Sequence, residues 1–179
     1  TALVMASVME DVSHDLAIRS NLDGTFALTL QITKSGYYTL QVYAKRTKDA
    51  SFVAQVSAAP FQVRVDAGMP SSVTSMALLS SSNVYEAGFE LSFQVQTRDR
   101  FGNEQMPDSY ARFSPAILVG KLILNGESVK TIWGSSLDQK DGKYVIQFPP
   151  VTLAAKYVLQ VYDRGYDVGR TPMPISCQP

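Results

Sequence analysis

Apolar and polar residues alternate with a period of two wherever this chain is regular. From Phe89 to Thr97 the odd positions are apolar or β-branched, whereas the even positions are polar. Successive side chains of a β-strand point to opposite faces, so this pattern predicts a strand with one buried and one solvent-exposed face. The same alternation is found in the segments Phe26–Ile32, Tyr38–Val42, Phe61–Val65, Tyr144–Phe148 and Tyr157–Val161. Strands of this kind predict an all-β fold in which antiparallel sheets pack as a sandwich.

Two parts of the chain have similar sequences in the same order. The motifs Asp23-Gly24-Thr25-Phe26, Gly36–Tyr43 and Ala59-Pro60-Phe61 recur as Asp141-Gly142-Lys143-Tyr144, Ala155–Tyr162 and Thr171-Pro172-Met173. A match that stays in order over two consecutive strands indicates two copies of one folding unit. Between them, Asp66–Ser72 contains Gly, Pro and small polar residues, a composition typical of a short linker. We therefore predict tandem modules with a boundary at Ala67–Met69.

Each predicted copy has a tyrosine two residues before a leucine, at Tyr38 and at Tyr157. In an immunoglobulin-like sandwich a tyrosine at this place forms a tyrosine corner, and antibody domains carry a disulfide cysteine two residues later. Leucine at that position, Leu40 and Leu159 here, replaces the disulfide by apolar packing. Burying one leucine contributes about 1.5–3 kcal/mol, similar to the lower end of a disulfide's contribution, so this fold does not require oxidation.

Charge and composition exclude several classes of partner. The chain has 16 basic and 16 acidic residues, so no broad positive field favours nucleic acid, which we do not expect as a partner. The longest apolar stretches, Ala2–Met9 and Ala116–Leu124, are far shorter than the roughly 20 residues of a membrane span, so we expect no membrane insertion. The single Cys177 and the absence of Asn-x-Ser/Thr sites favour a reducing compartment such as the cytoplasm over the cell exterior.

The sequence offers no convincing catalytic or zinc constellation. His14 is the single histidine, and Ser13 and Asp15 flank it. Adjacent residues of a strand point to opposite faces, so these three side chains cannot converge as a triad without a special turn. One cysteine and one histidine also fall short of a zinc ligand set with the usual spacing. We expect no enzyme activity, no cofactor and no metal.

Two polar clusters have a functional and a structural interpretation. Asp99 and Asn103, together with Asp138 or Asp141, have the oxygen ligands that calcium prefers. We favour the structural interpretation, in which Asp99 caps its own turn while Gly102 and Asn103 adopt positive φ angles. The basic run Lys45-Arg46-Thr47-Lys48 is similarly expected to be a solvated loop tip.

Several motifs of the second copy are similar to those of a known family. They begin with Gly68-Met69-Pro70, Ala87-Gly88 and the strand that ends in Asp99-Arg100-Phe101-Gly102-Asn103, and continue with Asp141-Gly142-Lys143-Tyr144, Tyr157–Val161 and Val168–Met173. Together they resemble the filamin-type immunoglobulin-like repeat. The resemblance implies a complete repeat in residues 69–179 and the C-terminal part of another, strands C to G, in residues 1–66. Thr171, Met173 and Ala155 depart from the family pattern, as does the segment Pro107–Leu124.

The resemblance leaves the first copy without its first two strands. We therefore expect either that the polypeptide begins inside a longer array or that another segment donates the missing strands. An orphaned half-sandwich exposes the inner faces of its strands, which favours aggregation.

The resemblance also implies a peptide-binding groove between the third and fourth strands of the second copy. Ligand peptides of filamin-type repeats add there as an extra strand. The corresponding candidate residues are Ile117, Val119, Lys121, Ile123, Thr131 and Trp133. For Trp133 the alternative is that its side chain fills the sandwich core.

Together these features favour a non-catalytic scaffolding module of a larger repeat protein. It would act as a spacer and as a docking surface for other proteins, by β-strand addition or as a neighbour in an assembly, and it would be associated with the cytoskeleton or with filaments. The alternative is a repeat of an extracellular adhesin or cell-surface stalk.

Overall fold

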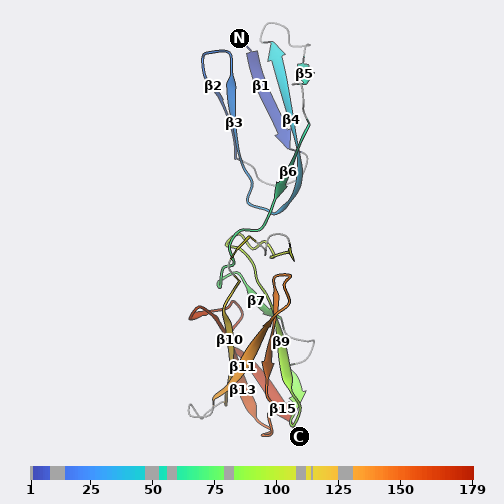
Figure 1. Ribbon diagram of the computed structural model, residues 1–179, viewed down its shortest axis with the longest axis vertical. Coiled ribbons are helices and arrows are strands. Elements are labelled where there is room, and N and C mark those ends of the chain that lie inside the picture. The colour runs from blue at the N-terminus through green and yellow to red at the C-terminus, as the bar shows by residue number, and fades with distance from the viewer. Residues whose placement is uncertain are drawn as a thin grey trace. The chain divides into compact units, whose positions relative to one another are not determined.

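A computed structural model describes residues 2–8, 15–46, 53–55, 60–78, 83–107, 112–113, 115–124 and 131–179, and these ranges are nearly all β (Figure 1). The chain divides into two compact units, Thr1–Asp66 and Ala67–Pro179, called unit 1 and unit 2 below. No helix among the described residues is long and apolar enough to cross a membrane.

Unit 2 is an immunoglobulin-like sandwich. Its strands are β7 (Met76–Leu78), β8 (Val84–Glu86), β9 (Leu91–Gln96), β10 (Leu118–Leu124), β11 (Thr131–Asp138), β12 (Lys143–Phe148), β13 (Lys156–Asp163), β14 (Tyr166–Asp167) and β15 (Met173–Gln178). One layer has the order β7-β9-β12-β11 and the other β10-β13-β15-β8, and β14 pairs with β13. The layers join into one curled sheet because β11 pairs with both β10 and β12. All described pairings in unit 2 are antiparallel except that of β15 with β8 and the isolated bridge between Met76 and Gly169.

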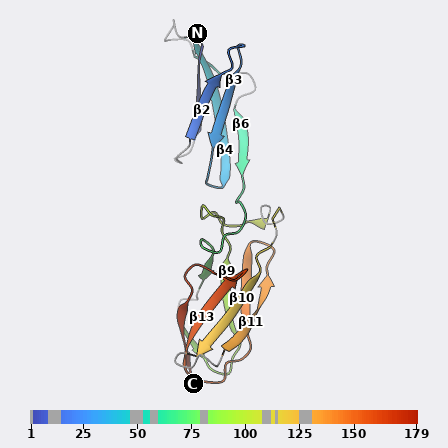
Figure 2. The same cartoon turned by 90° about the vertical axis from the view of Figure 1, so that its left-hand side faces the viewer.

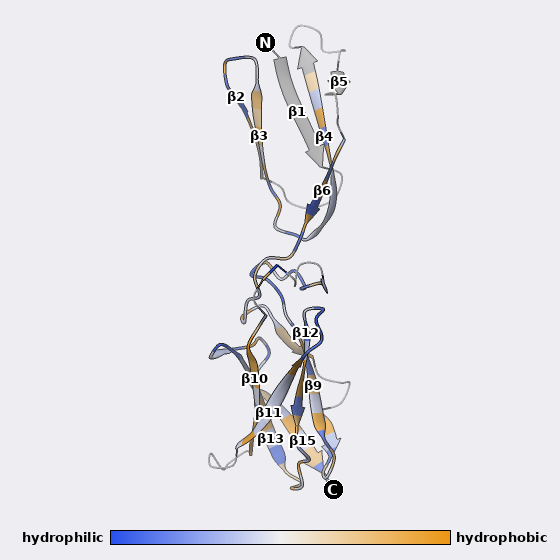
Figure 3. Ribbon diagram, viewed as in Figure 1, coloured by the Kyte–Doolittle hydropathy of each residue, from blue (hydrophilic) through white to orange (hydrophobic). Residues whose placement is uncertain are grey.

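The core of unit 2 lies between these layers and follows the predicted alternation. Leu91, Phe93 and Val95 of β9 are at most 2% exposed, and the rings of Phe93 and Phe148 meet edge to face, with centroids 5.8 Å apart. Hydrophobic and hydrophilic residues alternate along its strands (Figure 3). The alternation predicted for Phe89–Thr97 fails near each end of that segment. Phe89 precedes β9 and is exposed, whereas Gln96 was expected on the solvent side and is buried. The side-chain amide of Gln96 finds its hydrogen-bond acceptors among backbone carbonyls, including that of Thr97 at 3.1 Å.

Unit 1 contains two groups of strands. The first comprises β1 (Ala2–Val8), β4 (Gly36–Arg46), β5 (Val53–Gln55) and β6 (Phe61–Val65), and the second is the hairpin of β2 (Asp15–Ser20) and β3 (Phe26–Gln31). β4 pairs with β1 on one edge and with β6 and then β5 on the other. In unit 2, β13 pairs in the same way with β10 on one edge and with β15 and β14 on the other. The pairing scheme around the central strand is therefore the same in the two units.

The Asp-Gly turns of the two units have the same geometry. The residue before the aspartate has a φ angle of 64° in both, at Leu22 and Lys140, and the glycines have φ angles of 90° and 83°. In each turn the aspartate Oδ1 accepts a hydrogen bond of 2.9 Å from the backbone N–H two residues later. A side-chain oxygen thus takes the place of a backbone acceptor, which fixes the tight connection into the next strand.

Both predicted tyrosine corners are present. The hydroxyl of Tyr38 donates to the carbonyl of Lys34 at 2.8 Å, and that of Tyr157 donates to the carbonyl of Leu153 at 3.0 Å. The two rings are only 2% and 4% exposed. Each tyrosine therefore ties the start of the central strand to the loop before it, and the two residues occupy equivalent environments.

We expect Tyr157→Phe to lower the free energy of unfolding of unit 2 by about 1 kcal/mol, because the buried ring stays while its hydrogen bond is lost. Urea unfolding followed through amide resonances of unit 2 measures this change. Tyr162→Phe is the matched control, since the Tyr162 hydroxyl bonds only the Gln160 side chain among the contacts described. An equal loss in both variants would contradict a structural role for the corner.

Candidate protein-docking face

The six residues predicted to form a peptide groove lie on the outer side of β10 and β11. Within β10, Leu118, Gly120, Leu122 and Leu124 are buried, so Val119, Lys121 and Ile123 point outward, and Ile117 continues that row. Across the pair, Lys121 lies opposite Trp133 and Ile123 lies opposite Thr131. Directly opposed residues of antiparallel strands share a face, so the structure brings all six together. We call this surface the β10–β11 face.

The β10–β11 face is apolar and open. Ile117 is 63% exposed and Trp133 is 62% exposed. The interpretation in which Trp133 fills the core is therefore wrong; the neighbouring Ile132 packs against the core instead. Strand alternation explains this result, because two successive residues cannot both point inward. A shallow hollow lies beside the indole, lined by Glu90, Trp133, Ser135, Gln147, Phe148 and Pro149.

The face continues onto β13, which the sequence reasoning did not include. Figure 2 shows β13, β10 and β11 as neighbours, and their register places Tyr162 opposite Val119 and Gln160 opposite Lys121. The Lys121 ammonium lies 4.8 Å from the centroid of the Tyr162 ring. This contact aligns the cation over an aromatic face. The alternation in residues 157–162 already signalled that Tyr162 points away from the core.

A pair of glycines allows β11 to cross from one layer to the other. Gly120 of β10 lies opposite Gly134 of β11, and after this point β11 pairs with β12. A Cβ atom on Gly134 would lie 2.9 Å from side-chain atoms of Ile146 and Phe148. Because neither glycine has a positive φ angle, close packing explains their presence rather than backbone conformation.

This crossing limits where a peptide strand can add. Along Gly120–Ile123 the edge of β10 is already hydrogen-bonded to β11. Before Gly120, β10 no longer pairs with β11, because the part of β11 after Gly134 pairs with β12. The side chains of Ile117, Val119 and Leu137 are exposed in this region. Within residues 117–123, the edge of β10 that faces β11 has unoccupied main-chain positions before Gly120, whereas Gly120–Ile123 offer side-chain contacts.

We expect Gly134→Ala to destabilise unit 2 by about 1–3 kcal/mol, because the added methyl overpacks the site against Ile146 and Phe148. Thermal unfolding followed by circular dichroism measures the loss. The neighbouring Ser135→Ala places a similar change on an exposed side chain and should stay within about 0.5 kcal/mol of the parent. A stable Gly134→Ala variant would show that β11 does not need the close approach.

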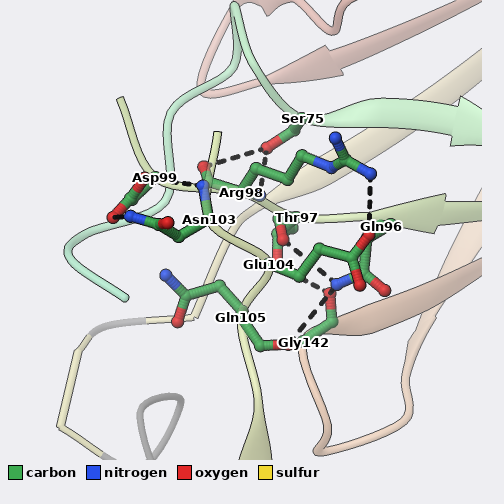
Figure 4. A network of polar contacts seen from close by, with 9 residues as sticks. All are labelled: Ser75, Gln96, Thr97, Arg98, Asp99, Asn103, Glu104, Gln105 and Gly142. Atoms are coloured by element: carbon green, nitrogen blue, oxygen red, sulfur yellow. Dashed lines mark hydrogen bonds and ion pairs between the residues drawn. The ribbon is translucent and has the colours of Figure 1, made fainter. Parts of the chain in front are cut away.

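The second candidate cluster, around Asp99, is a capped turn (Figure 4). The Asp99 carboxylate is buried and accepts hydrogen bonds from the backbone N–H groups of Gly68, Phe101 and Asn103 at 2.9–3.0 Å, and from the Asn103 amide at 2.8 Å. These four donors occupy the oxygens that a calcium ion would need. The expected capping role is confirmed, although only Gly102, with a φ of 85°, has the positive angle expected of both Gly102 and Asn103.

Burial and hydrogen bonding act on the Asp99 carboxyl in opposite directions. Burial raises its pKa, but the hydrogen bonds from Asn103, Gly68 and Phe101 together outweigh burial, so the pKa lies below its ordinary value of 3.8. A carboxyl with a lowered pKa in the folded state stabilises the fold above the unfolded pKa. This stabilisation is lost as the pH falls through the folded pKa.

We therefore expect Asp99→Asn to lower the free energy of unfolding of unit 2 by about 2 kcal/mol at neutral pH, through the loss of charge-assisted hydrogen bonds. The difference from the parent should shrink as the pH falls through the lowered pKa of Asp99, where protonation weakens the parent itself. Urea titrations at several pH values measure both effects. A difference that does not depend on pH would show that the ionised form of Asp99 is not what stabilises the turn.

The other candidates provide no chemical site in the described part of the chain. Ser13, His14, Thr47 and Lys48 lie outside the described residues, and Asp15, Lys45 and Arg46 contribute backbone pairs to β2 and β4. The carboxylates of Asp138 and Asp141 cap the turn before β12. They accept hydrogen bonds from the backbone N–H groups of Lys140 and Lys143, respectively. Among the described residues, no three His, Cys, Asp or Glu side chains are grouped to hold a metal ion. Burial raises the pKa of the Cys177 thiol, which disfavours the reactive thiolate.

Comparisons with known proteins bear on the fold. The search against protein-family models finds no match, and the search of curated proteins finds no significant one. Among solved structures, the Lin-41 filamin domain is 16% identical, with a TM-score of 0.49, over 61% of this chain and 96% of that domain. The Escherichia coli adhesin FdeC is 18% identical, with a TM-score of 0.54, over 96% of this chain and 51% of that chain. The present chain thus spans about half the length of the adhesin structure.

The strand order and the likeness to the FdeC structure together define the fold class of this protein. It is an all-β protein with an immunoglobulin-like fold. The described residues present an exposed, largely apolar face on β10 and β11 and a capped turn around Asp99.

Proposed function

We propose that this chain is a non-catalytic structural and interaction module of a larger repeat protein, which acts as a spacer and as a docking surface. The main support is the pair of matching geometries in the two units, the Asp-Gly turn and the tyrosine corner. Two units of one type joined by a short segment would set the distance between whatever binds them.

The proposed docking surface is the β10–β11 face of unit 2. Exposed tryptophan and isoleucine side chains on one face are typical of protein-binding surfaces, because a few large side chains contribute most of the binding energy. Trp133 is the expected central contact, with Ile117 and Val119 on the part of β10 that is open to an added strand. The partner we propose is a protein of a cytoskeletal or filamentous assembly, in keeping with the filamin-like sequence motifs.

A second candidate function is adhesion at a cell surface. The observation that favours it is the FdeC comparison, which extends over 96% of the chain and therefore over parts of both units. At 18% identity this likeness shows the fold alone, so the adhesive role remains a proposal. The two candidates share the non-catalytic module and differ in compartment and partner.

We expect Trp133→Ala to remove docking partners while leaving the fold unchanged, because the indole is mostly exposed. The test is proximity labelling in the native cell with the chain fused to a labelling enzyme, comparing the parent with Trp133→Ala. Ser136→Ala is the matched control, since Ser136 is an exposed residue of β11 outside the face. Circular dichroism of each variant checks that the fold is retained.

Selective loss of neighbours in Trp133→Ala supports the docking face, and the identity of those neighbours separates the two functions. Cytoskeletal or filament proteins support the leading proposal. Proteins of the cell exterior support adhesion. Identical neighbour sets for parent and variant would contradict the β10–β11 face as the docking site.

A further inference from the structure

Unit 1 exposes side chains at positions where unit 2 buries them. The shared Asp-Gly turn aligns β3 with β12, so that three residues of each strand correspond: Phe26, Leu28 and Leu30 in β3 with Tyr144, Ile146 and Phe148 in β12. The three β12 residues are at most 2% exposed. In β3, however, Phe26 is 38% exposed and the two leucines are only half-buried. The apolar side chains of Phe26, Leu28 and Leu30 are thus less covered than their counterparts in β12.

In unit 2 this cover is provided by β9. β9 pairs antiparallel with β12, with Phe93 opposite Ile146 and Leu91 opposite Phe148. It thereby satisfies the backbone groups along that edge of β12 and places an apolar side chain beside each buried residue. The other edge of β12 pairs with β11.

The corresponding edge of β3 has no strand among the described residues of unit 1. β3 pairs with β2 on one edge, with Leu28 opposite Ile18, as β12 pairs with β11. No strand within residues 2–8, 15–46, 53–55 and 60–66 pairs with its other edge. An edge that combines unpaired backbone groups with an apolar face is a template for a further strand.

The uncovered region extends across the sandwich to β4. Leu40 and Val42 are half-buried, whereas Leu159 and Val161 at the equivalent places in β13 are fully buried. Among the side chains described in residues 17–44 and 60–66, Tyr38 alone is buried. A strand added to β3 would therefore cover the interior of unit 1, not just its edge.

We propose that the free edge of β3 accepts an antiparallel strand of the β9 type, which is an extended segment with apolar side chains at alternate positions. The added strand would carry apolar side chains opposite Phe26, Leu28 and Leu30. This inference concerns the interior of unit 1 and does not depend on the docking face of unit 2.

A second copy of this chain is a poorer donor. Its own β9 is held on one edge by β7 and on the other by β12, and its apolar side chains are buried in the core of unit 2. Donating β9 would therefore require unit 2 to unfold.

The test uses chain 1–179 and a synthetic peptide of residues 88–98, which contains β9. We expect the peptide to slow amide hydrogen exchange of Phe26–Gln31 by about tenfold or more, because the added strand protects that edge. A peptide carrying Phe93→Asp and Val95→Asp is the negative control. In the chain, Leu28→Asp should abolish the protection, whereas Thr29→Asp, on the opposite face of β3, should retain it.

The absence of protection by the peptide of residues 88–98 would overturn the acceptor edge. A dimer of chain 1–179 in sedimentation that Leu28→Asp dissociates would assign the edge to a second copy instead. None of these outcomes changes the labelling result for Trp133.

Discussion

The burial of alternate side chains between two layers is the interaction on which this structure depends. In unit 2 the inward positions of β9, β12 and β13 meet in one core, and each strand uses its other face for solvent. Backbone hydrogen bonds fix the register, and a slip of one residue would turn every apolar side chain outward. Unit 1 has the same alternation but only part of the second layer among its described residues, which explains why equivalent side chains are covered in one unit and exposed in the other.

Polar groups are arranged around this core so that buried donors and acceptors find partners. The Asp99 turn places one carboxylate against four donors, and the tyrosine corners bring a hydroxyl to a carbonyl four residues upstream. Such contacts contribute modestly as single bonds, but leaving their groups unpaired inside the protein costs more. These hydrogen bonds hold the loops before β4 and β13, and the turn around Asp99, against the strands that they connect.

Sequence periodicity predicted the strands and much of the core because it depends on local geometry alone. The repeated motifs located the tyrosine corners and the Asp-Gly turns. The family resemblance supplied the six residues of the β10–β11 face, of which five lie on β10 and β11 and Ile117 directly precedes β10. Periodicity failed where tertiary structure decides. Phe89 continues the apolar pattern but lies before β9, and Gln96 is buried because backbone carbonyls surround its amide. The crossing of β11 could not be anticipated, since Gly120 and Gly134 read as ordinary strand glycines until Ile146 and Phe148 are placed beneath them.

The parallel pairing of β8 with β15 has a mechanical consequence. β8 lies near the N-terminal end of unit 2 and β15 at its C-terminal end, and the two strands run in the same direction. Tension between the two ends that reaches this pair pulls β8 and β15 along their axes in opposite directions. The hydrogen bonds between them are then loaded together in shear and do not open one after another. Stretching unit 2 between its two ends would therefore be resisted in part by this small strand pair.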